Sequence, residues 1–210
     1  MKPVSYPMSQ FFVGKLNYPG KKSLVDKIKQ RYLDQRTLKP DFWKEDVHTS
    51  IIYSDRAIPP SDYFHQAYIP SDLIPLLDDK VQSVVREQNL SSVGDFYISE
   101  IWYNAYTRGQ YQFPHKHSDG QSTIFSGIYF IKFDENEHSA PRFYNPGVDI
   151  SFDKVLDNKC LVIQPKIAED DLILFLSDIG HDVPEQLSDK LRITISFNVR
   201  CNFHARMQYT

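Results

Sequence analysis

The stretch FYISEIWYNAY, residues 96–106, decides the class of fold because it is rich in aromatic and isoleucine side chains. Such residues suit the pleated, half-buried surface of a β-sheet, and the turn pair Arg108-Gly109 ends the run. Similar runs follow at residues 111–117, 123–133, 142–144, 148–152, 161–164, 172–176 and 191–200. About eight short strands separated by turn residues predict a mainly β fold with a double-stranded β-helix core, the jelly-roll or cupin-like architecture.

The chain ahead of this region has a different pattern. Residues 22–34 and 71–85 carry apolar side chains at helical spacing, and the cap-type residue Asp72 precedes the second of these stripes. The proline-rich stretch 39–70 between them predicts mostly irregular chain. We therefore expect residues 1–210 to form a single domain, in which residues 1–94 are a helical and irregular elaboration and residues 95–200 are the double-stranded β-helix core. The helices are expected to pack on one sheet and support it.

Composition narrows the class of protein. Of the 210 residues, 41% are hydrophobic and 24% are charged, which is typical of a globular protein. The formal net charge of −3 predicts no general attraction to nucleic acid, and no apolar run approaches the roughly 20 residues that span a bilayer. Cys160 and Cys201 have no metal-ligand spacing, and the N-terminus lacks the apolar segment of a secretory signal. We expect a cytoplasmic protein with reduced thiols.

One pair of histidines stands close together in the sequence. His115 and His117 lie two residues apart in an extended segment, so their side chains project from the same face. His181, which follows the buried run 172–176 and a turn, is the best candidate for a third ligand. Three ligands with open positions suit iron in an oxygenase better than a closed zinc site, which usually has four protein ligands. Taken alone, the pair is more often ordinary polar decoration of a loop.

Arg192 is the other residue that the fold alone does not explain. It opens a run whose pattern otherwise indicates core, and a buried guanidinium needs an anionic partner to offset its desolvation. A carboxylate matches it through two parallel hydrogen bonds, and Thr194, on the same face, could add another. An ion pair to Asp or Glu, or a side chain that reaches out to solvent at the strand end, is an equally good explanation of Arg192 alone.

Together these residues resemble the 2-oxoglutarate/Fe(II) oxygenase superfamily. The segment GQYQFPHKH, residues 109–117, is similar to the strand that enters the metal site in prolyl-hydroxylase-like members. The motifs W-x-N at 102–104, SGIYF at 126–130, F-x-S-x-x-x-H at 175–181 and RITISFN at 192–198 resemble an oxygenase family common in bacteriophages and marine bacteria. The resemblance covers roughly half of the chain, from Phe96 to Val199.

This resemblance implies an activity and its cofactors. The enzyme would use Fe(II), the small-molecule cosubstrate 2-oxoglutarate and O₂ to hydroxylate a C–H bond of an unknown substrate, either a peptidyl residue or a small molecule. His115, His117 and His181 would be the metal ligands and catalytic residues, and Arg192 with Thr194 would bind the cosubstrate. Tyr103, Tyr106 and Tyr129 are expected to pack in the sheet, and one of their hydroxyls, with Tyr103 as the chosen candidate, is expected to help hold the cosubstrate. The organism would be a bacterium or a phage-infected host.

One position departs from the superfamily, whose second ligand is usually a carboxylate. Either His117 occupies that position, or the register shifts so that His117 and Asp119 supply the first two ligands; the first alternative is preferred because the match fixes His115. Two other functions remain open: a cupin-like dioxygenase that uses three histidines without 2-oxoglutarate, and a jelly-roll binding or virion-associated module without turnover. Three further histidines, His48, His65 and His204, are expected to be structural, and His138, in an acidic loop, is expected to be solvated.

Overall fold

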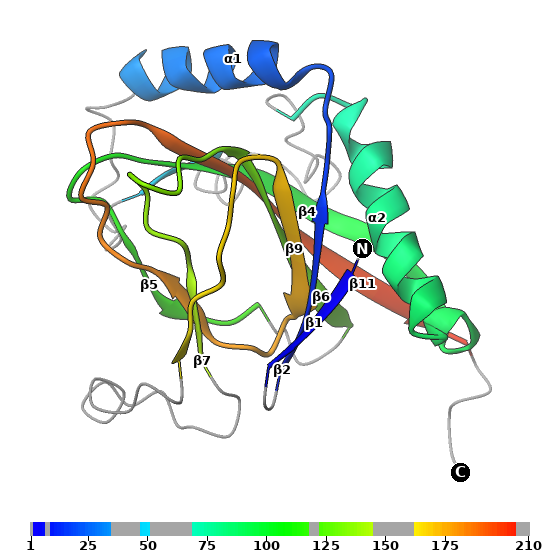
Figure 1. Ribbon diagram of the computed structural model, residues 1–210. Coiled ribbons are helices and arrows are strands. Elements are labelled where there is room, and N and C mark those ends of the chain that lie inside the picture. Colours follow the sequence, from blue (N-terminus) through cyan, green and yellow to red (C-terminus); the bar gives the residue numbers. More distant parts are fainter. Residues whose placement is uncertain are drawn as a thin grey trace.

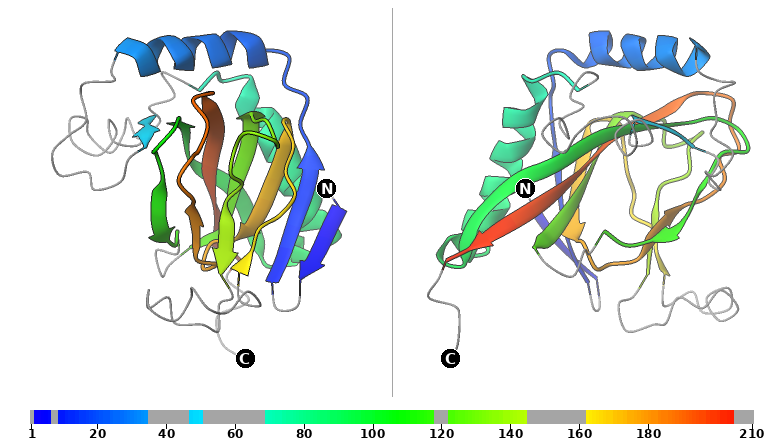
Figure 2. Two further views of the ribbon diagram at one scale, coloured as in Figure 1. Left: turned by 60° about the vertical axis from the view of Figure 1, so that its left-hand side comes forward. Right: turned by 180° about the vertical axis from the view of Figure 1, so that it is seen from behind.

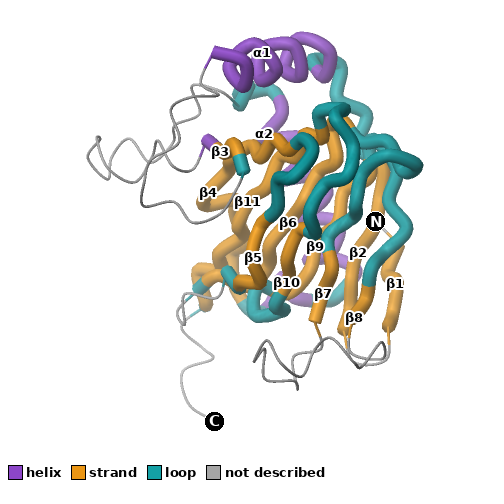
Figure 3. The backbone as a smooth tube through the Cα atoms, turned by 90° about the vertical axis from the view of Figure 1, so that its left-hand side faces the viewer, coloured by secondary structure: helices purple, strands orange, loops and turns teal. Residues whose placement is uncertain are grey.

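Two β-sheets lie face to face in the computed structural model, which describes residues 2–6, 9–34, 47–50, 69–117, 122–144 and 162–204 (Figure 1). All strand pairs are antiparallel. The larger sheet has, in spatial order, β1 (Lys2–Tyr6), β2 (Ser9–Lys15), β9 (Asp171–Leu176), β6 (Thr123–Lys132), β11 (Arg192–Phe203), β4 (Gly94–Tyr106) and β3 (His48–Thr49). The smaller sheet has β5 (Gln112–His115), β10 (His181–Val183), β7 (Arg142–Tyr144) and β8 (Val162–Ile163), as Figure 3 shows. The predicted mainly β, jelly-roll class of fold is confirmed.

Strand β11 is the central element of the larger sheet. It pairs with β4 along one edge and with β6 along the other, so the backbone groups of both edges are satisfied. Side chains alternate across a strand, and the odd-numbered residues 193–201 belong to an apolar cluster with the helices. The even-numbered residues point toward the smaller sheet, and they are all polar: Arg192, Thr194, Ser196 and Asn198.

Two helices cover the other face and the end of the larger sheet. Helix α2 (Leu73–Glu87) lies along the outer face and α1 (Lys21–Asp34) lies across one end of the sheet (Figures 1 and 2). The helix α2 buries Leu73, Leu77, Val81, Val84 and Val85. At about 1.5–3 kcal/mol for each side chain, this burial contributes on the order of 10 kcal/mol before the loss of conformational entropy. Neither described helix is long and apolar enough to cross a membrane.

The structure departs from the sequence predictions at the N-terminal part of the chain. Strands β1 and β2 extend the larger sheet through pairing of β2 with β9, where we had predicted only helices and irregular chain. The Asp72 side chain makes no capping hydrogen bond at the start of α2, because its carboxylate instead accepts the Tyr18 hydroxyl at 3.0 Å. The predicted strand 148–152, and with it His65, Asp119 and Cys160, lie outside the described residues. The division of the chain at residues 94 and 95 stays a prediction.

Candidate metal centre

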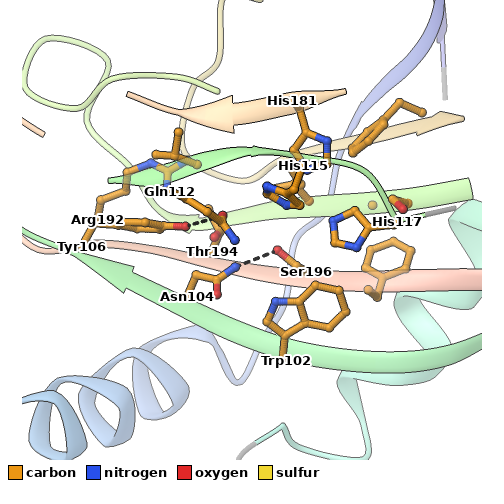
Figure 4. A pocket seen from close by; sticks show the side chains of 16 residues that line it. Trp102, Asn104, Tyr106, Gln112, His115, His117, His181, Arg192, Thr194 and Ser196 are labelled. Carbon is orange, nitrogen blue, oxygen red and sulfur yellow. Dashed lines mark hydrogen bonds between the residues drawn. The ribbon is translucent and has the colours of Figure 1, made fainter. Parts of the chain in front are cut away.

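A pocket lies between the two sheets, with β4 and β11 on one side and β5 and β10 on the other (Figure 4). It has a volume of about 380 Å³, which includes open space at its mouth. The part of this space that can hold the centre of a water-sized molecule is only about 20 Å³, so side chains fill most of the gap between the sheets. Its lining combines histidine, arginine, serine and threonine side chains with aromatic rings.

The structure brings three histidines from distant parts of the sequence together at this pocket. His115 ends β5, His181 begins β10, and the two residues are partners in the antiparallel pair. His117 follows β5, where its backbone N–H donates to the carbonyl of Ser177 at 3.0 Å. The ring centroids of His115 and His181 lie 4.3 Å apart, and each lies about 5 Å from that of His117, at 5.0 and 5.1 Å. One nitrogen of each ring lies within 4.8 Å of the others, so all three can reach one ion.

Hydrogen bonds set the tautomers of two of these rings. Nδ1 of His115 lies 2.8 Å from the carbonyl of Phe113, and Nδ1 of His181 lies 3.2 Å from that of Ile179. A carbonyl only accepts, so each Nδ1 carries the proton and the Nε2 lone pair of the neutral ring is left for a metal. This is the usual arrangement of metal-ligating histidines.

Burial keeps the three rings neutral. The pKa of His181 lies well below its ordinary value because the ring is fully buried and because the other two rings are near it. Burial, with a contribution from the charge of His115, lowers the pKa of His117 to about 3. Burial also lowers the pKa of His115, against the opposing effects of the Phe113 carbonyl and a nearby carboxylate. Neutral imidazole is the form that binds metal ions, so the cluster is prepared for a divalent cation at neutral pH.

Behind His181, a salt bridge holds β10 against β7. The carboxylate of Asp182, with 4% of its side chain exposed, accepts hydrogen bonds from the guanidinium of Arg142 and from the Tyr144 hydroxyl, the latter at 2.8 Å. Burial and this carboxylate raise the pKa of Tyr144, so the hydroxyl stays protonated and donates. The cluster fixes the strand pairing that places His181 opposite His115.

Arg192 enters the same pocket from β11 and is only 1% exposed. Its guanidinium carbon lies 4.8 Å from the centre of the Tyr106 ring, with Phe130 and Phe133 at 5.7 and 5.8 Å. Its Nε and Nη1 have no hydrogen-bond partner, and no carboxylate of the described residues pairs with it. Burial lowers the pKa of Arg192, and the neighbouring Tyr106 opposes that shift. An unpaired buried guanidinium is expensive, which indicates an anionic ligand.

The remaining predicted cosubstrate residues have different outcomes. Thr194 lies in the pocket beside Arg192 and is 2% exposed. Tyr103 does not line the pocket, because alternation along β4 turns it to the opposite face, where its hydroxyl lies 3.1 Å from Nε2 of His48. On the pocket side of β4, Tyr106 occupies the place expected for Tyr103 and donates to Oε1 of Gln112 at 3.0 Å.

The prediction for His138 was wrong, because this ring is buried. It is 7% exposed and packs against Phe133, with Nε2 3.0 Å from the Lys190 carbonyl and Nδ1 accepting the Asp134 N–H at 3.0 Å. The acidic side chains of its loop point to solvent while the ring closes the turn. Sequence reasoning gave no role to four buried polar residues of the larger sheet, Asn104, Ser126, Ser196 and Asn198. For the three on β4 and β11, the period-two pattern of those strands is the signal that could have found them, whereas Ser126 lies on the almost wholly buried strand β6.

Comparisons with known proteins agree with this geometry. Residues 100–198 match a family model described as "Putative 2OG-Fe(II) oxygenase". A prolyl-4-hydroxylase from Pseudomonas putida has a similar structure, with 13% identity, a TM-score of 0.56, and 90% of this chain and 92% of that chain covered. HygX from Streptomyces hygroscopicus, solved with nickel and 2-oxoglutarate, has 12% identity, a TM-score of 0.56, and 95% and 90% covered.

A viral collagen prolyl hydroxylase from Paramecium Bursaria Chlorella virus-1, solved as a 2-oxoglutarate complex, is similar with 10% identity, a TM-score of 0.54, and 91% and 95% of the chains covered. A comparison with curated protein sequences gave no match. At such low identities the likeness to solved structures shows the fold, while the family match lies on the strands that carry the pocket. The resemblance of the sequence to the 2OG-Fe(II) oxygenases is thereby confirmed over residues 100–198, on a fold shared with prolyl hydroxylases.

Proposed function

We propose that this protein is an Fe(II)- and 2-oxoglutarate-dependent oxygenase that hydroxylates a C–H bond of a second substrate. The observation that carries the proposal is the presence, in one pocket, of two complementary features. Three neutral imidazoles can hold a divalent cation, and Arg192 offers buried N–H groups that have no partner. An anion beside a metal is what both features require, and 2-oxoglutarate is such an anion.

His115, His117 and His181 would hold the metal, with Nε2 of His115 and His181 as the ligand atoms that the tautomers leave available. Imidazole ligands suit Fe(II), and three protein ligands leave coordination positions open for small molecules. When bound, the iron supplies the oxygen chemistry that couples decarboxylation of 2-oxoglutarate to substrate oxidation. The protein's histidines orient the ion, and Asp182 with its partners keeps His181 in place.

Arg192 would bind the distal carboxylate of 2-oxoglutarate. A guanidinium pairs with a carboxylate through two parallel hydrogen bonds along its Nε/Nη2 edge or its Nη1/Nη2 edge, and each edge of Arg192 contains one of the two atoms without partners, Nε or Nη1. The Thr194 hydroxyl lies beside it on the same face of β11 and would add a hydrogen bond. The aromatic rings around the guanidinium, above all Tyr106, exclude water and strengthen this electrostatic contact.

The ligand at the second metal position is proposed to be His117. The centroid of its ring lies 5.1 Å from that of His181 and 5.0 Å from that of His115, so the ring of His117 can reach the same ion. Asp119, the alternative, lies outside the described residues. Three neutral ligands leave the metal more positive than two histidines and a carboxylate would, which favours a dianionic cosubstrate.

The three-histidine set also favours a second candidate, a cupin-like dioxygenase that works without 2-oxoglutarate. In that case Arg192 would bind a carboxylate of the substrate itself. A peptidyl residue is the preferred second substrate under the main proposal, since two of the similar structures are prolyl hydroxylases. Binding of 2-oxoglutarate separates the two candidates.

The test combines a spectrum with a product. Under anaerobic conditions, Fe(II) and 2-oxoglutarate together should give the weak visible charge-transfer band of a chelated complex, and oxygen should then give slow succinate formation. Arg192→Met should abolish both at 2-oxoglutarate concentrations that saturate the wild type. Arg108→Met, at an exposed arginine paired with Asp189, is the matched control and should change neither. Iron binding without the band and without succinate would overturn the proposal in favour of the second candidate.

A further inference from the structure

Two serines on the floor of the pocket are not used by the proposed function. Ser196 on β11 and Ser126 on β6 both line the pocket and are 8% and 2% exposed. Each is backed by a buried asparagine, Ser196 by Asn104 on β4 and Ser126 by Asn198 on β11. A serine hydroxyl can donate or accept, so the direction of these hydrogen bonds determines what the serines present to a ligand.

The direction of the first chain follows from a carboxylate at its outer end. Glu100, Asn198 and Ser126 are neighbours across the strands β4, β11 and β6. Oε2 of Glu100 can only accept, so the Asn198 amide turns Nδ2 toward it, at 2.6 Å, and turns Oδ1 toward Ser126. Oδ1 can also only accept, so the Ser126 hydroxyl donates to it at 2.9 Å. The single hydrogen of Ser126 is thereby used, and only lone pairs remain for the pocket.

The second chain has its direction set at the edge strand β3. The Thr49 hydroxyl donates to the Tyr103 carbonyl at 3.1 Å, so its oxygen accepts from Nδ2 of Asn104, 2.7 Å away. Oδ1 of Asn104 then faces the indole N–H of Trp102 at 3.3 Å and accepts from the Ser196 hydroxyl at 3.2 Å. Figure 4 draws this amide turned the other way, with its nitrogen toward Ser196.

The opposite orientation of this amide, with Nδ2 toward Ser196, is disfavoured by two of its neighbours. It would set Nδ2 of Asn104 against the Trp102 N–H, which can only donate, and Oδ1 against the Tyr103 carbonyl, which can only accept. In the orientation that satisfies every neighbour, Ser196 donates its one hydrogen to Asn104. Ser196 therefore also presents lone pairs alone to the pocket.

We infer that Ser126 and Ser196 form an acceptor-only floor that selects a second substrate with a hydrogen-bond donor, a hydroxyl or an N–H group, beside the metal. That the ligand of this floor is a second substrate rests on the proposed function. That the two serines only accept hydrogen bonds rests on the two chains of hydrogen bonds alone. The pocket then has two chemically distinct ends. Arg192 donates to a carboxylate at one end, and the serine floor accepts from a hydroxyl or N–H at the other.

The pair of ends sorts ligands by chemistry. A carboxylate turned toward the serines meets lone pairs and gains no hydrogen bond, so the cosubstrate's anionic end is directed to Arg192. An ether or a fully alkylated amide lacks a donor. When it binds, both serine oxygens lose water without gaining a hydrogen bond, which weakens binding. Polyhydroxylated compounds and peptide or amide N–H groups satisfy the floor.

The test uses Trp102 as an internal reporter, since its indole lines the same floor. The sequence has one other tryptophan, Trp43, and Trp43→Phe leaves Trp102 as the only tryptophan, which is excited selectively at wavelengths that tyrosine does not absorb. Zn(II) replaces Fe(II), because it has no redox chemistry and 2-oxoglutarate is not consumed. Two probes of the same carbon skeleton, propane-1,2-diol and its dimethyl ether, are titrated against the loaded protein, and their dissociation constants are read from the fluorescence.

The diol should bind about two- to twelvefold more tightly than the ether, the range expected for one neutral hydrogen bond. Ser126→Ala and Ser196→Ala should each narrow this ratio by weakening the diol. Asn198→Leu should also narrow the ratio of the two dissociation constants, but by strengthening the binding of the ether, because the freed Ser126 hydrogen can then donate to an ether oxygen. Ser83→Ala, on the exposed face of α2, is the matched control and should leave the ratio unchanged.

Equal binding of the two probes, including no measurable binding of either, would overturn the inference, as would a ratio insensitive to both serine variants. The same titration on the metal-free protein separates this result from failure of the proposed function. A diol preference that persists without zinc and 2-oxoglutarate supports the floor even where the cosubstrate does not bind. Loss of cosubstrate binding alone counts against the proposed function only.

Discussion

Replacing Arg192 by methionine should stabilise the ligand-free protein while it abolishes 2-oxoglutarate binding. Arg192 is 1% exposed, and Nε and Nη1 have no partner. Two orphan buried donors cost about 1–3 kcal/mol each. Against this, the variant loses the cation–π contact with Tyr106, worth about 0.5–2 kcal/mol. Methionine keeps most of the aliphatic stem, so the net gain is about 1–4 kcal/mol, the range seen when buried charges become apolar residues.

Ligand should reduce or reverse this difference in stability between the variant and the wild type. For a domain of this size a change of 1 kcal/mol moves the melting temperature by about 2–4 °C, so the apo variant should melt roughly 2–15 °C higher than the wild type. In protein already loaded with Zn(II), 2-oxoglutarate at about 100 times its Kd should add about 2.7 kcal/mol to the wild type and almost nothing to the variant. Differential scanning calorimetry after removal of metal with a chelator, with and without these ligands, measures both effects.

The matched control is Arg142→Met, the same substitution at an arginine that has its partner. Removing Arg142 leaves the buried Asp182 carboxylate with the Tyr144 hydroxyl alone, and should destabilise the protein. Because 39% of the Arg142 side chain is exposed, the expected loss is discounted to about 1–3 kcal/mol. An apo Arg192→Met protein that melts below the wild type, or one that 2-oxoglutarate stabilises as strongly, would refute the assignment of Arg192 to an absent anion.

Three further outcomes are expected. His181→Ala should lose bound metal in elemental analysis, whereas His138→Ala, at a buried histidine outside the cluster, should retain it despite lower stability. The pKa of His48 is lowered to about 4 by burial and a nearby arginine, against about 6.5 in the unfolded chain, so its contribution to stability is present above pH 6.5 and is lost as pH falls toward 4. Urea unfolding of His48→Gln should show a shallower loss over that range; an unchanged slope would contradict the shift. Gly127→Ala should cost about 1–3 kcal/mol in the same assay, because its Cβ would lie 2.1 Å from the Phe197 ring.

The fold was predictable where a single strand carries its own signal. The run 96–106 lies within β4, and the runs at 172–176 and 191–200 lie within or beside β9 and β11. Strands β1 and β2 were missed because their sequences show no regular apolar–polar alternation, and because they become strands only by pairing with each other and with β9. Pairing between distant segments is a property of the folded chain, which local propensity does not contain.

The site was predictable as a set of residues but not as a geometry. The spacing of the histidines together with the family resemblance predicted His115, His117 and His181 as ligands, and the structure places them at one pocket with Arg192 and Thr194. Tyr103 and Tyr106 differ by three positions and therefore lie on opposite faces of β4, which a prediction based on the presence of a hydroxyl ignored. The alternation rule itself was sufficient to choose the face, since Trp102 and Asn104 share it with Tyr106.

The polarity of the serine floor could not be predicted from residue type at all. Ser196 by itself is equally a donor and an acceptor, and what it presents depends on Asn104, whose amide is turned by Thr49 on another strand. Ser126 depends in the same way on Glu100, two strands away. Substitutions at these outer positions, which touch no ligand, should therefore change which ligands the pocket accepts. Selectivity in this pocket is set by the direction of hydrogen bonds across the larger sheet, and the residues that fix that direction lie at its edge and at its surface.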